Sequence, residues 1–207
     1  ERKWNKILSR IEVSDENETN MIKFYSALYH MLIHPNVIND VNGDYPLMGK
    51  NGTGNYNDKN RYSIFSLWDT YRTLHPFLSL VYPEKQIEMV NTMIDMYSES
   101  GFLPKWDLAG VETYMMVGDP AVPVIADTYI KGLTQFDTDK AFEAMMKHTD
   151  IKEGEKAPPV RAGYHEMLQY GYIPFEQDWS KDWWVWGPVS TTLEYCVADY
   201  SIAKFSK

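Results

Sequence analysis

The residues best suited to chemistry in this chain of 207 residues are Trp68, Asp69 and Arg72. Read as a helix of about 100° per residue, the segment places these three side chains together, away from the face that the helix would bury. The buried face would carry Leu67, Tyr71, Leu74 and Leu78. An indole, a carboxylate and a guanidinium side by side either line a polar cavity or brace the helix through an Asp69–Arg72 ion pair.

A second group of polar and aromatic residues lies in the connection from Gly101 to Asp119, which has no helical period. It contains Trp106, Glu112 and Asp119. Asp119 precedes an almost wholly apolar helical segment that starts with Pro120, so it is placed to cap that helix. This structural role could by itself explain the aspartate.

The elements that position these residues are predicted to be helices. Apolar residues recur at helical spacing in Trp4–Ile11, Met21–Leu32, the segment around Trp68, Ile87–Tyr97, Pro120–Gly132, Asp139–His148, Ala162–Tyr170 and the segment from Pro188 onward, where the stripe is Val189, Leu193, Val197 and Ile202. Pro76 should bend or end the helix that carries Trp68. Long connections (36–60, 101–119 and 150–187) alternate with short ones, and the last of them contains the cluster Trp179–Trp186.

This alternation has a spatial consequence. In a bundle of antiparallel helices, connections that alternate long and short place every long one at the same end. We therefore expect Trp106 and Glu112 to approach Trp68 in space. No strand-rich stretch is longer than a hairpin, so the predicted architecture is all-α, with helical hairpins arranged around an axis as in an α/α toroid.

Composition and net charge argue against several classes of function. The formal charge of −9 and a pI near 5.0 argue against nucleic acid as a partner. No apolar run approaches the roughly 20 residues of a membrane helix, and the single Cys196 excludes an internal disulfide. Aromatic residues make up 14% of the chain, including 7 Trp and 15 Tyr. Such an excess is typical either of core packing or of carbohydrate sites.

Two patterns could suggest a metal. His30 and His34 are four residues apart, but the segment lacks the glutamate of a zinc-protease helix, so hydrogen-bonded histidines are the preferred interpretation. The segment from Asp40 to Asp44 has alternating oxygen ligands but neither the glycine nor the closing glutamate of an EF-hand, which favours turn chemistry. The residues themselves therefore predict no metal site.

Several longer motifs carry a resemblance. The segments Tyr62–Arg72, Pro104–Trp106, Ala109–Thr113, Gly118–Ala121 and Val189–Tyr195 resemble family 92 of the glycoside hydrolases, the calcium-dependent exo-acting α-mannosidases. The likeness covers nearly the whole chain. One departure is Val111, where the family often has asparagine before the Glu-Thr pair.

The resemblance implies that residues 1–207 form part of an (α/α)6 toroid, a catalytic domain that removes terminal α-mannose, usually α-1,2-linked, with inversion. It also implies calcium as cofactor, with ligands outside this chain, a mannose-containing glycan as substrate, and a periplasmic or secreted location. The family's acid lies in a Glu-Gly-Asn-Ala-Trp motif and its base in a Gly-Asn-Asp/Glu-Asp motif. Neither motif occurs here, so we expect both carboxylates beyond Lys207 and no activity from residues 1–207 alone.

Three hypotheses follow. In the first, the chain is part of an exo-α-mannosidase, and Trp68, Asp69, Arg72, Trp106, Glu112 and Asp119 shape its sugar pocket. In the second, it is a non-catalytic helical domain that binds a glycan or serves as a scaffold. In the third, the Asp69–Arg72 pair and Asp119 only brace helix ends. A partial toroid would expose apolar helix flanks, which the rest of the enzyme or a second copy would cover.

Overall fold

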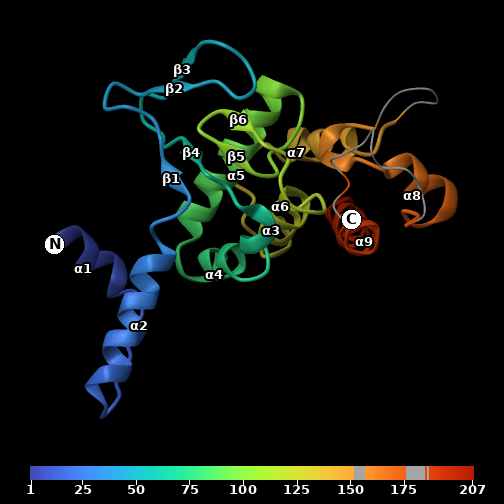
Figure 1. The fold of residues 1–207 in the computed structure, drawn as a ribbon. Coiled ribbons are helices and arrows are strands. Elements are labelled where there is room, and N and C mark those ends of the chain that lie inside the picture. The colour runs from blue at the N-terminus through green and yellow to red at the C-terminus, as the bar shows by residue number, and fades with distance from the viewer. Residues whose placement is uncertain (152–156, 176–184, 186) are drawn as a thin grey trace.

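The computed structural model describes residues 1–151, 157–175, 185 and 187–207 (Figure 1). The Trp179–Trp186 cluster lies outside these residues, apart from Val185. The described helices are α1 (Arg2–Leu8), α2 (Glu18–Met31), α3 (Leu67–Thr70), α4 (Leu74–Val81), α5 (Pro83–Ser100), α6 (Ala121–Ile130), α7 (Thr138–Lys147), α8 (Tyr164–Tyr170) and α9 (Pro188–Phe205), with a 3-10 turn η1 (Pro159–Arg161). The described part of the chain is therefore mainly helical, as predicted.

Short strands occur in and beside the long connections. Among the residues that the structure describes they form three antiparallel pairs: β1 (Asn36–Val37) with β4 (Tyr62–Ser63), β2 (Asp44–Pro46) with β3 (Thr53–Asn55), and β5 (Asp107–Leu108) with β6 (Val111–Glu112). None is longer than a hairpin strand, so they shape loops and do not build a layer of the fold.

The helices α4 to α7 and α9 form the centre of the described part of the molecule. A hairpin joins α4 to α5 through Tyr82, with Pro83 in the first turn of α5. Helix α6 packs against α4, α5 and α9, and α7 packs against α5 and α9. The α6 segment is apolar almost all round, and Ala121, Val122 and Ile125 are fully buried within it. This burial confirms the sequence interpretation of the segment.

The segment around Trp68 is not one helix. The chain leaves β4, turns at Ile64, forms the single turn α3, breaks at Thr73 and resumes as α4. The helix that carries Trp68 therefore ends at Thr70, shortly before Pro76, which has no N–H to donate to the carbonyl of Arg72. Pro76 itself lies in the first turn of α4, where a backbone N–H has no helical partner, so it does not disturb that second helix. The predicted apolar stripe is nevertheless buried at Leu67, Leu74 and Leu78, with Tyr71 partly buried.

Of the predicted apolar stripe of α9, only Ile202 faces the core. Val189, Leu193 and Val197 are 68%, 64% and 39% exposed. Besides Ile202, the buried face of α9 carries Thr191, Tyr195, Ala198 and Phe205. The small Ala198 lets α9 approach α6 closely, and the Tyr195 hydroxyl donates to the carbonyl of Ala162 at 2.9 Å. Helix α9 therefore packs through a face of mixed polar and apolar residues, and the apolar flank formed by Val189, Leu193 and Val197 stays exposed.

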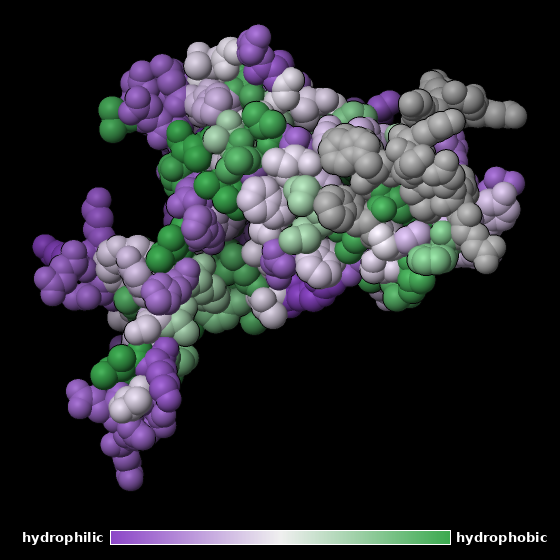
Figure 2. Space-filling model, viewed as in Figure 1, coloured by the Kyte–Doolittle hydropathy of each residue, from purple (hydrophilic) through white to green (hydrophobic). Residues whose placement is uncertain are grey.

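The first two helices project from the body (Figure 1). Hydrophilic residues dominate this α1–α2 segment, whereas hydrophobic residues reach the surface over the body (Figure 2). Arg10 ties the segment to the α4–α5 hairpin, because it donates to the Val81 carbonyl at 3.0 Å and pairs with Glu84 at 2.5 Å. None of the described helices is long and apolar enough to span a lipid bilayer.

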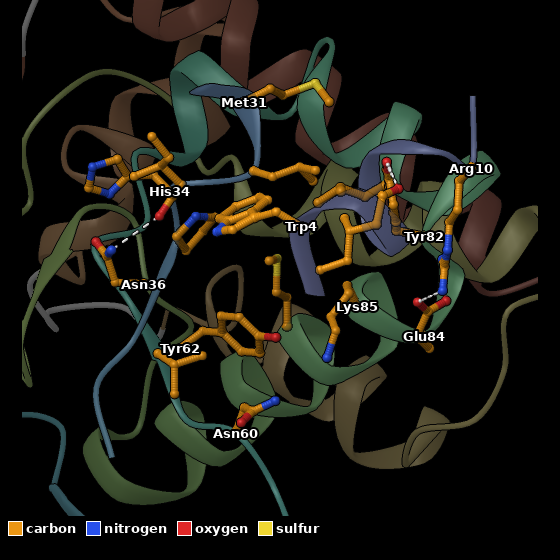
Figure 3. A pocket seen from close by; sticks show the side chains of 17 residues that line it. Trp4, Arg10, Met31, His34, Asn36, Asn60, Tyr62, Tyr82, Glu84 and Lys85 are labelled. Atoms are coloured by element: carbon orange, nitrogen blue, oxygen red, sulfur yellow. Dashed lines mark hydrogen bonds and ion pairs between the residues drawn. The ribbon is translucent and has the colours of Figure 1, made fainter. Parts of the chain in front are cut away.

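A cavity of about 300 Å³ lies where the N-terminal segment meets the α4–α5 hairpin (Figure 3). Its walls are mainly apolar and include Trp4, Met31 and Tyr62. The charged groups at its rim are already paired, since Arg10 binds Glu84 and Lys85 binds Glu88 at 2.9 Å. None of the six candidate site residues lines it.

The long connections contact one another, as the alternation of lengths predicts. The Gly49 N–H donates to the carbonyl of Gly110 at 2.8 Å, which joins the first connection to the second. Lys105 Nζ donates to the Val160 carbonyl at 3.4 Å, which joins the second to the described part of the third. Residues far apart in the sequence therefore meet around α3.

Candidate functional site

Asp69 and Trp106 belong to one chain of hydrogen bonds. The indole Nε1 of Trp106 donates to Ser66 Oγ at 2.8 Å, and the Ser66 hydroxyl donates to Asp69. Ser66 stands at the N-cap of α3 and Asp69 in its only turn. Since Trp106 comes from the second long connection, the expected approach to the segment around Trp68 is observed. Asp69 is exposed, so Ser66 orients its carboxylate without covering it.

Arg72 does not pair with Asp69. Its guanidinium donates to the carbonyl of Trp68 at 2.6 Å and forms an ion pair with Glu194. It also lies over the Trp68 ring, with its central carbon 4.9 Å from the ring centroid. The physical reason is the shortness of α3: its last carbonyls have no helical partner, and Arg72, just past the helix end, satisfies one of them. The predicted Asp69–Arg72 brace is therefore wrong.

Glu194 is a residue that the sequence analysis did not select. It reaches from α9 to accept a hydrogen bond from the Tyr71 hydroxyl at 2.8 Å, beside its ion pair with Arg72. Burial of the Tyr71 ring and the charge of Glu194 raise the pKa of Tyr71 to about 12. The only sequence signal was the motif Val189–Tyr195, which contains Glu194 but assigns it no role.

Gly118 allows this close approach. A Cβ atom at Gly118 would lie 2.6 Å from the Cβ of Glu194, and the backbone φ of Gly118 is 79°. Both constraints require glycine. The second long connection and α9 therefore touch beside Arg72.

Glu112 directs its carboxylate toward the backbone. It accepts hydrogen bonds from the N–H groups of Lys105 at 2.7 Å, Trp106 at 2.9 Å and Tyr114 at 2.8 Å. Burial raises the pKa of Glu112, and these three hydrogen bonds act against that rise. Glu112 thus fixes the loop that presents the Trp106 indole.

Asp119 does not cap α6, contrary to the sequence expectation. The helix starts after Pro120 without a side-chain cap, and Asp119 is only 1% exposed. Its Oδ2 accepts from His148 Nδ1 at 2.8 Å and from Arg161 Nε at 2.8 Å. His148 Nε2 accepts the Leu103 N–H at 3.0 Å, so the ring donates through Nδ1.

This contact set explains the ionisation of Asp119. Burial alone would raise the pKa of the carboxyl group, but the interactions with His148 and Arg161 outweigh it and hold the pKa well below its usual range. Asp119 therefore joins the second long connection to α7 and η1 inside the protein. In this structure it does not reach the surface near Asp69.

Unusual backbone conformations gather in the segments that carry the candidate residues. The non-glycine residues with positive φ are Ile64 (64°), Ala109 (48°), Tyr114 (54°) and Met116 (69°). Left-handed conformations of this kind cost about 1–3 kcal/mol each and persist only where the surroundings impose them. The side chain of Trp68 is unusual as well, because its indole Nε1 is buried and has no hydrogen-bond acceptor in the described part of the chain.

The calcium that the resemblance implies does not fit the described residues. They contain no group of three or more His, Cys, Asp or Glu side chains that could hold a metal ion. In the Asp40–Asp44 segment the oxygens serve a turn: Asp40 Oδ1 accepts the Val41 N–H at 2.7 Å, and Asn42 Oδ1 accepts the Asp44 N–H at 3.0 Å. His30 and His34 are both exposed and join no such group.

Comparison with known proteins gives consistent matches. The profile of the glycosyl hydrolase family 92 catalytic domain matches residues 1–207. An inverting mannosidase of family 92 from Bacteroides thetaiotaomicron superposes with a TM-score of 0.83 at 31% identity, over 99% of this chain and 27% of that protein. A family 92 α-mannosidase of the same organism, solved with mannoimidazole, gives a TM-score of 0.80 at 34% identity, over 98% of this chain and 25% of that protein.

A more distant relative is an uncharacterized secreted glycosidase of Arthroderma benhamiae. It is 23% identical over 211 residues, which cover 100% of this chain and 23% of that protein. The chain therefore spans about a quarter of the length of these relatives.

Proposed function

The chain belongs to glycosyl hydrolase family 92, and on that basis we propose that it is part of an exo-acting α-mannosidase that removes terminal α-mannose, with α-1,2 linkages as the preferred substrate. Two matching structures are described as mannosidases, one of them as inverting. The helices α4 to α7 would then be part of an (α/α)6 toroid, with residues 1–207 as one portion of that domain.

One observation carries the proposal: the exposed Asp69 carboxylate is held by Ser66 beside the indole of Trp106. Sugars are recognised by ring faces that pack on their C–H groups and by carboxylates that accept bonds from their hydroxyls. We assign the hydroxyl contact to Asp69 and the packing contacts to Trp68 and Trp106. Arg72 supports the Trp68 ring, and Glu112 and Asp119 shape the pocket from behind.

The Nε1 of Trp68, which has no acceptor among the described residues, supports the same location. A buried donor without an acceptor is costly, so it marks a place where another group completes the contact. A sugar oxygen or an acceptor from the rest of the enzyme would satisfy it. Either would bring Trp68 and Asp69 into one polar pocket.

Bond cleavage needs more than these residues. Inversion requires an acid and a base carboxylate about 6.5–9.5 Å apart with a water between them. Glu112 and Asp119 are committed to structural contacts, so Asp69 is the one of the six candidate residues whose carboxylate is exposed and open to this chemistry. We propose that the acid, the base and the calcium ligands belong to parts of the enzyme outside residues 1–207, and that the enzyme works in the periplasm or outside the cell.

The same observation supports a second candidate, a non-catalytic helical domain that binds a glycan. Release of mannose from an α-1,2-mannobiose by the intact protein separates the two, with NMR detection of the anomer formed first. β-Mannose as the first product supports an inverting mannosidase. Binding without release would leave only the binding domain.

The exposed flank of α9 supports a proposal about partners. Val189, Leu193 and Val197 form an apolar strip that a soluble protein rarely leaves uncovered. We propose that the rest of the enzyme covers it, and that residues 1–207 alone associate through it.

A further inference from the structure

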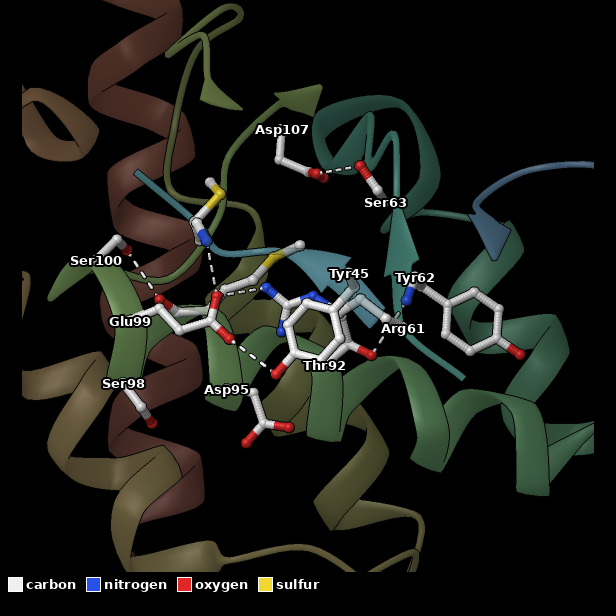
Figure 4. Close-up of polar contacts among 12 residues, drawn as sticks. Tyr45, Arg61, Tyr62, Ser63, Thr92, Asp95, Ser98, Glu99, Ser100 and Asp107 are labelled. Atoms are coloured by element: carbon white, nitrogen blue, oxygen red, sulfur yellow. Dashed lines mark hydrogen bonds and ion pairs between the residues drawn. The ribbon is translucent and has the colours of Figure 1, made fainter. Parts of the chain in front are cut away.

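Asp107 is a fully buried carboxylate that joins the two segments of the candidate site (Figure 4). Its Oδ2 accepts the hydroxyl of Ser63 at 2.5 Å, and its Oδ1 accepts the N–H of Phe65 at 3.0 Å. Ser63 Oγ in turn accepts the N–H of Ala109 at 2.8 Å. One carboxylate and one hydroxyl therefore tie 63–65 to 107–109.

The protons in this cluster fix the state of Asp107. Ser63 has a single hydroxyl hydrogen, which goes to Asp107, while its oxygen receives the Ala109 N–H. Asp107 therefore acts only as an acceptor on both oxygens, as an ionised carboxylate does. Burial raises the pKa of Asp107, while the hydrogen bonds from Ser63 and Phe65 and the charge of Arg61, itself fully buried and paired with Glu99 at 2.7 Å, act against that rise.

The residue between the two anchored groups is strained. Ile64 has a φ of 64°, a left-handed conformation that a β-branched side chain strongly disfavours. Its neighbours Ser63 and Phe65 are both bound to Asp107, so the chain cannot relax at Ile64 without losing one of these bonds. Ala109, whose N–H is bound to Ser63, is left-handed as well, with a φ of 48°.

This turn determines where the proposed sugar contacts lie. Directly after Phe65 comes Ser66, which orients Asp69, and directly before Asp107 comes Trp106, which donates to Ser66. Asp107 thus fixes both partners of the Trp106–Ser66 hydrogen bond, although it is buried and contacts no open surface.

We propose that Asp107 is a positioning residue for mannoside binding: it holds Ile64 in its left-handed turn and thereby places Trp106 and Asp69 in a common pocket. This inference rests on the proposed function for its effect on activity. Its structural part, the control of the turn and of the Trp106–Ser66 contact, can be tested independently.

The test uses the intact protein with Asp107→Asn, and Ser63→Ala as a second variant in case the first fails to fold. Asn cannot accept on both sides, so Ile64 should leave the left-handed region and the Trp106–Ser66 hydrogen bond should break in the crystal structure. kcat/KM for an α-mannoside should fall roughly 10- to 100-fold, the size expected for a misplacement of about 1 Å. The matched control is Asp95→Asn on α5, a partly buried carboxylate bonded to Tyr56 and outside the site, which should stay within about threefold of the unaltered protein.

A rescue experiment tests whether Asp107 acts through the turn at Ile64. Glycine adopts positive φ without strain, so Ile64→Gly added to Asp107→Asn should recover at least threefold of the lost kcat/KM. An Asp107→Asn or Ser63→Ala structure with Ile64 still left-handed and the Trp106–Ser66 bond intact would overturn the inference. If the unaltered protein hydrolysed no α-mannoside, the proposed function would fail, while the two crystal structures would still decide the positioning role.

Discussion

Replacement of Asp69 tests the proposed pocket most directly. The structure leaves its carboxylate exposed and oriented by Ser66, so in the intact enzyme it can accept a hydrogen bond from a mannose hydroxyl. Hydrogen bonds to charged groups contribute about 1.5–3 kcal/mol. At about 1.4 kcal/mol per tenfold change in rate, Asp69→Ala should lower kcat/KM by roughly 10- to 150-fold. Asp69→Asn keeps one acceptor oxygen and should lose less.

The assay is mannose release from α-1,2-mannobiose by the intact enzyme, with Asp139→Ala as the control. Asp139 is likewise an exposed aspartate in the first turn of a helix, α7, remote in sequence from the site. A double-mutant cycle with Ser66→Ala adds detail, because Ser66 both orients Asp69 and accepts the Trp106 indole: the two losses should be less than additive, with the remaining loss in the double variant reporting the Trp106 contact. If Asp69→Ala retained kcat/KM within about threefold of the unaltered enzyme, under roughly 1 kcal/mol, the pocket assignment would be wrong.

Three further expectations can be measured. Asp119→Asn should destabilise the intact protein in urea, because it removes one of the charges that pair with buried Arg161; the loss should stay below the about 3–5 kcal/mol of a buried charge left without any partner, since Arg161 keeps its ion pair with Asp199 at 2.5 Å. Since the folded-state pKa of Asp119 is lowered, its stabilisation is complete above the unfolded-state value of about 3.9 and is lost as the pH falls below it, so the variant should show a flatter acid limb. Gly118→Ala should cost about 1–3 kcal/mol, because its Cβ would meet Glu194 at 2.6 Å in a left-handed backbone; a change within 0.5 kcal/mol would contradict the close approach of α9. Purified residues 1–207 should release no mannose from α-1,2-mannobiose; turnover near the rate of the intact protein would place the catalytic carboxylates within this chain. The same sample should self-associate in a sedimentation experiment, and Leu193→Glu should reduce the association because Leu193 lies on the exposed apolar flank of α9.

The sequence alone determined the helical class and most helix positions. Hydrophobic periodicity is a local property, so it located α5, the buried α6 and the buried positions Leu67, Leu74 and Leu78 without knowledge of their partners. The alternation of connection lengths also predicted that the long connections meet, as the bond between Gly49 and Gly110 shows. The family motifs added the identity of the domain.

Tertiary structure decided how the polar groups pair. Arg72 pairs with Glu194 on α9 and not with the neighbouring Asp69. Asp119 binds His148 and Arg161 instead of capping the helix beside it. A distant partner also determines the orientation of α9. Helix α6 packs on the face of α9 that carries Ala198, so Val189, Leu193 and Val197 stay exposed. A buried charge must be matched by whatever surface folds against it, and that surface comes from residues distant in the sequence. The periodicity of one segment carries no information about that partner, so the helices could be predicted from the sequence but the contacts between them could not.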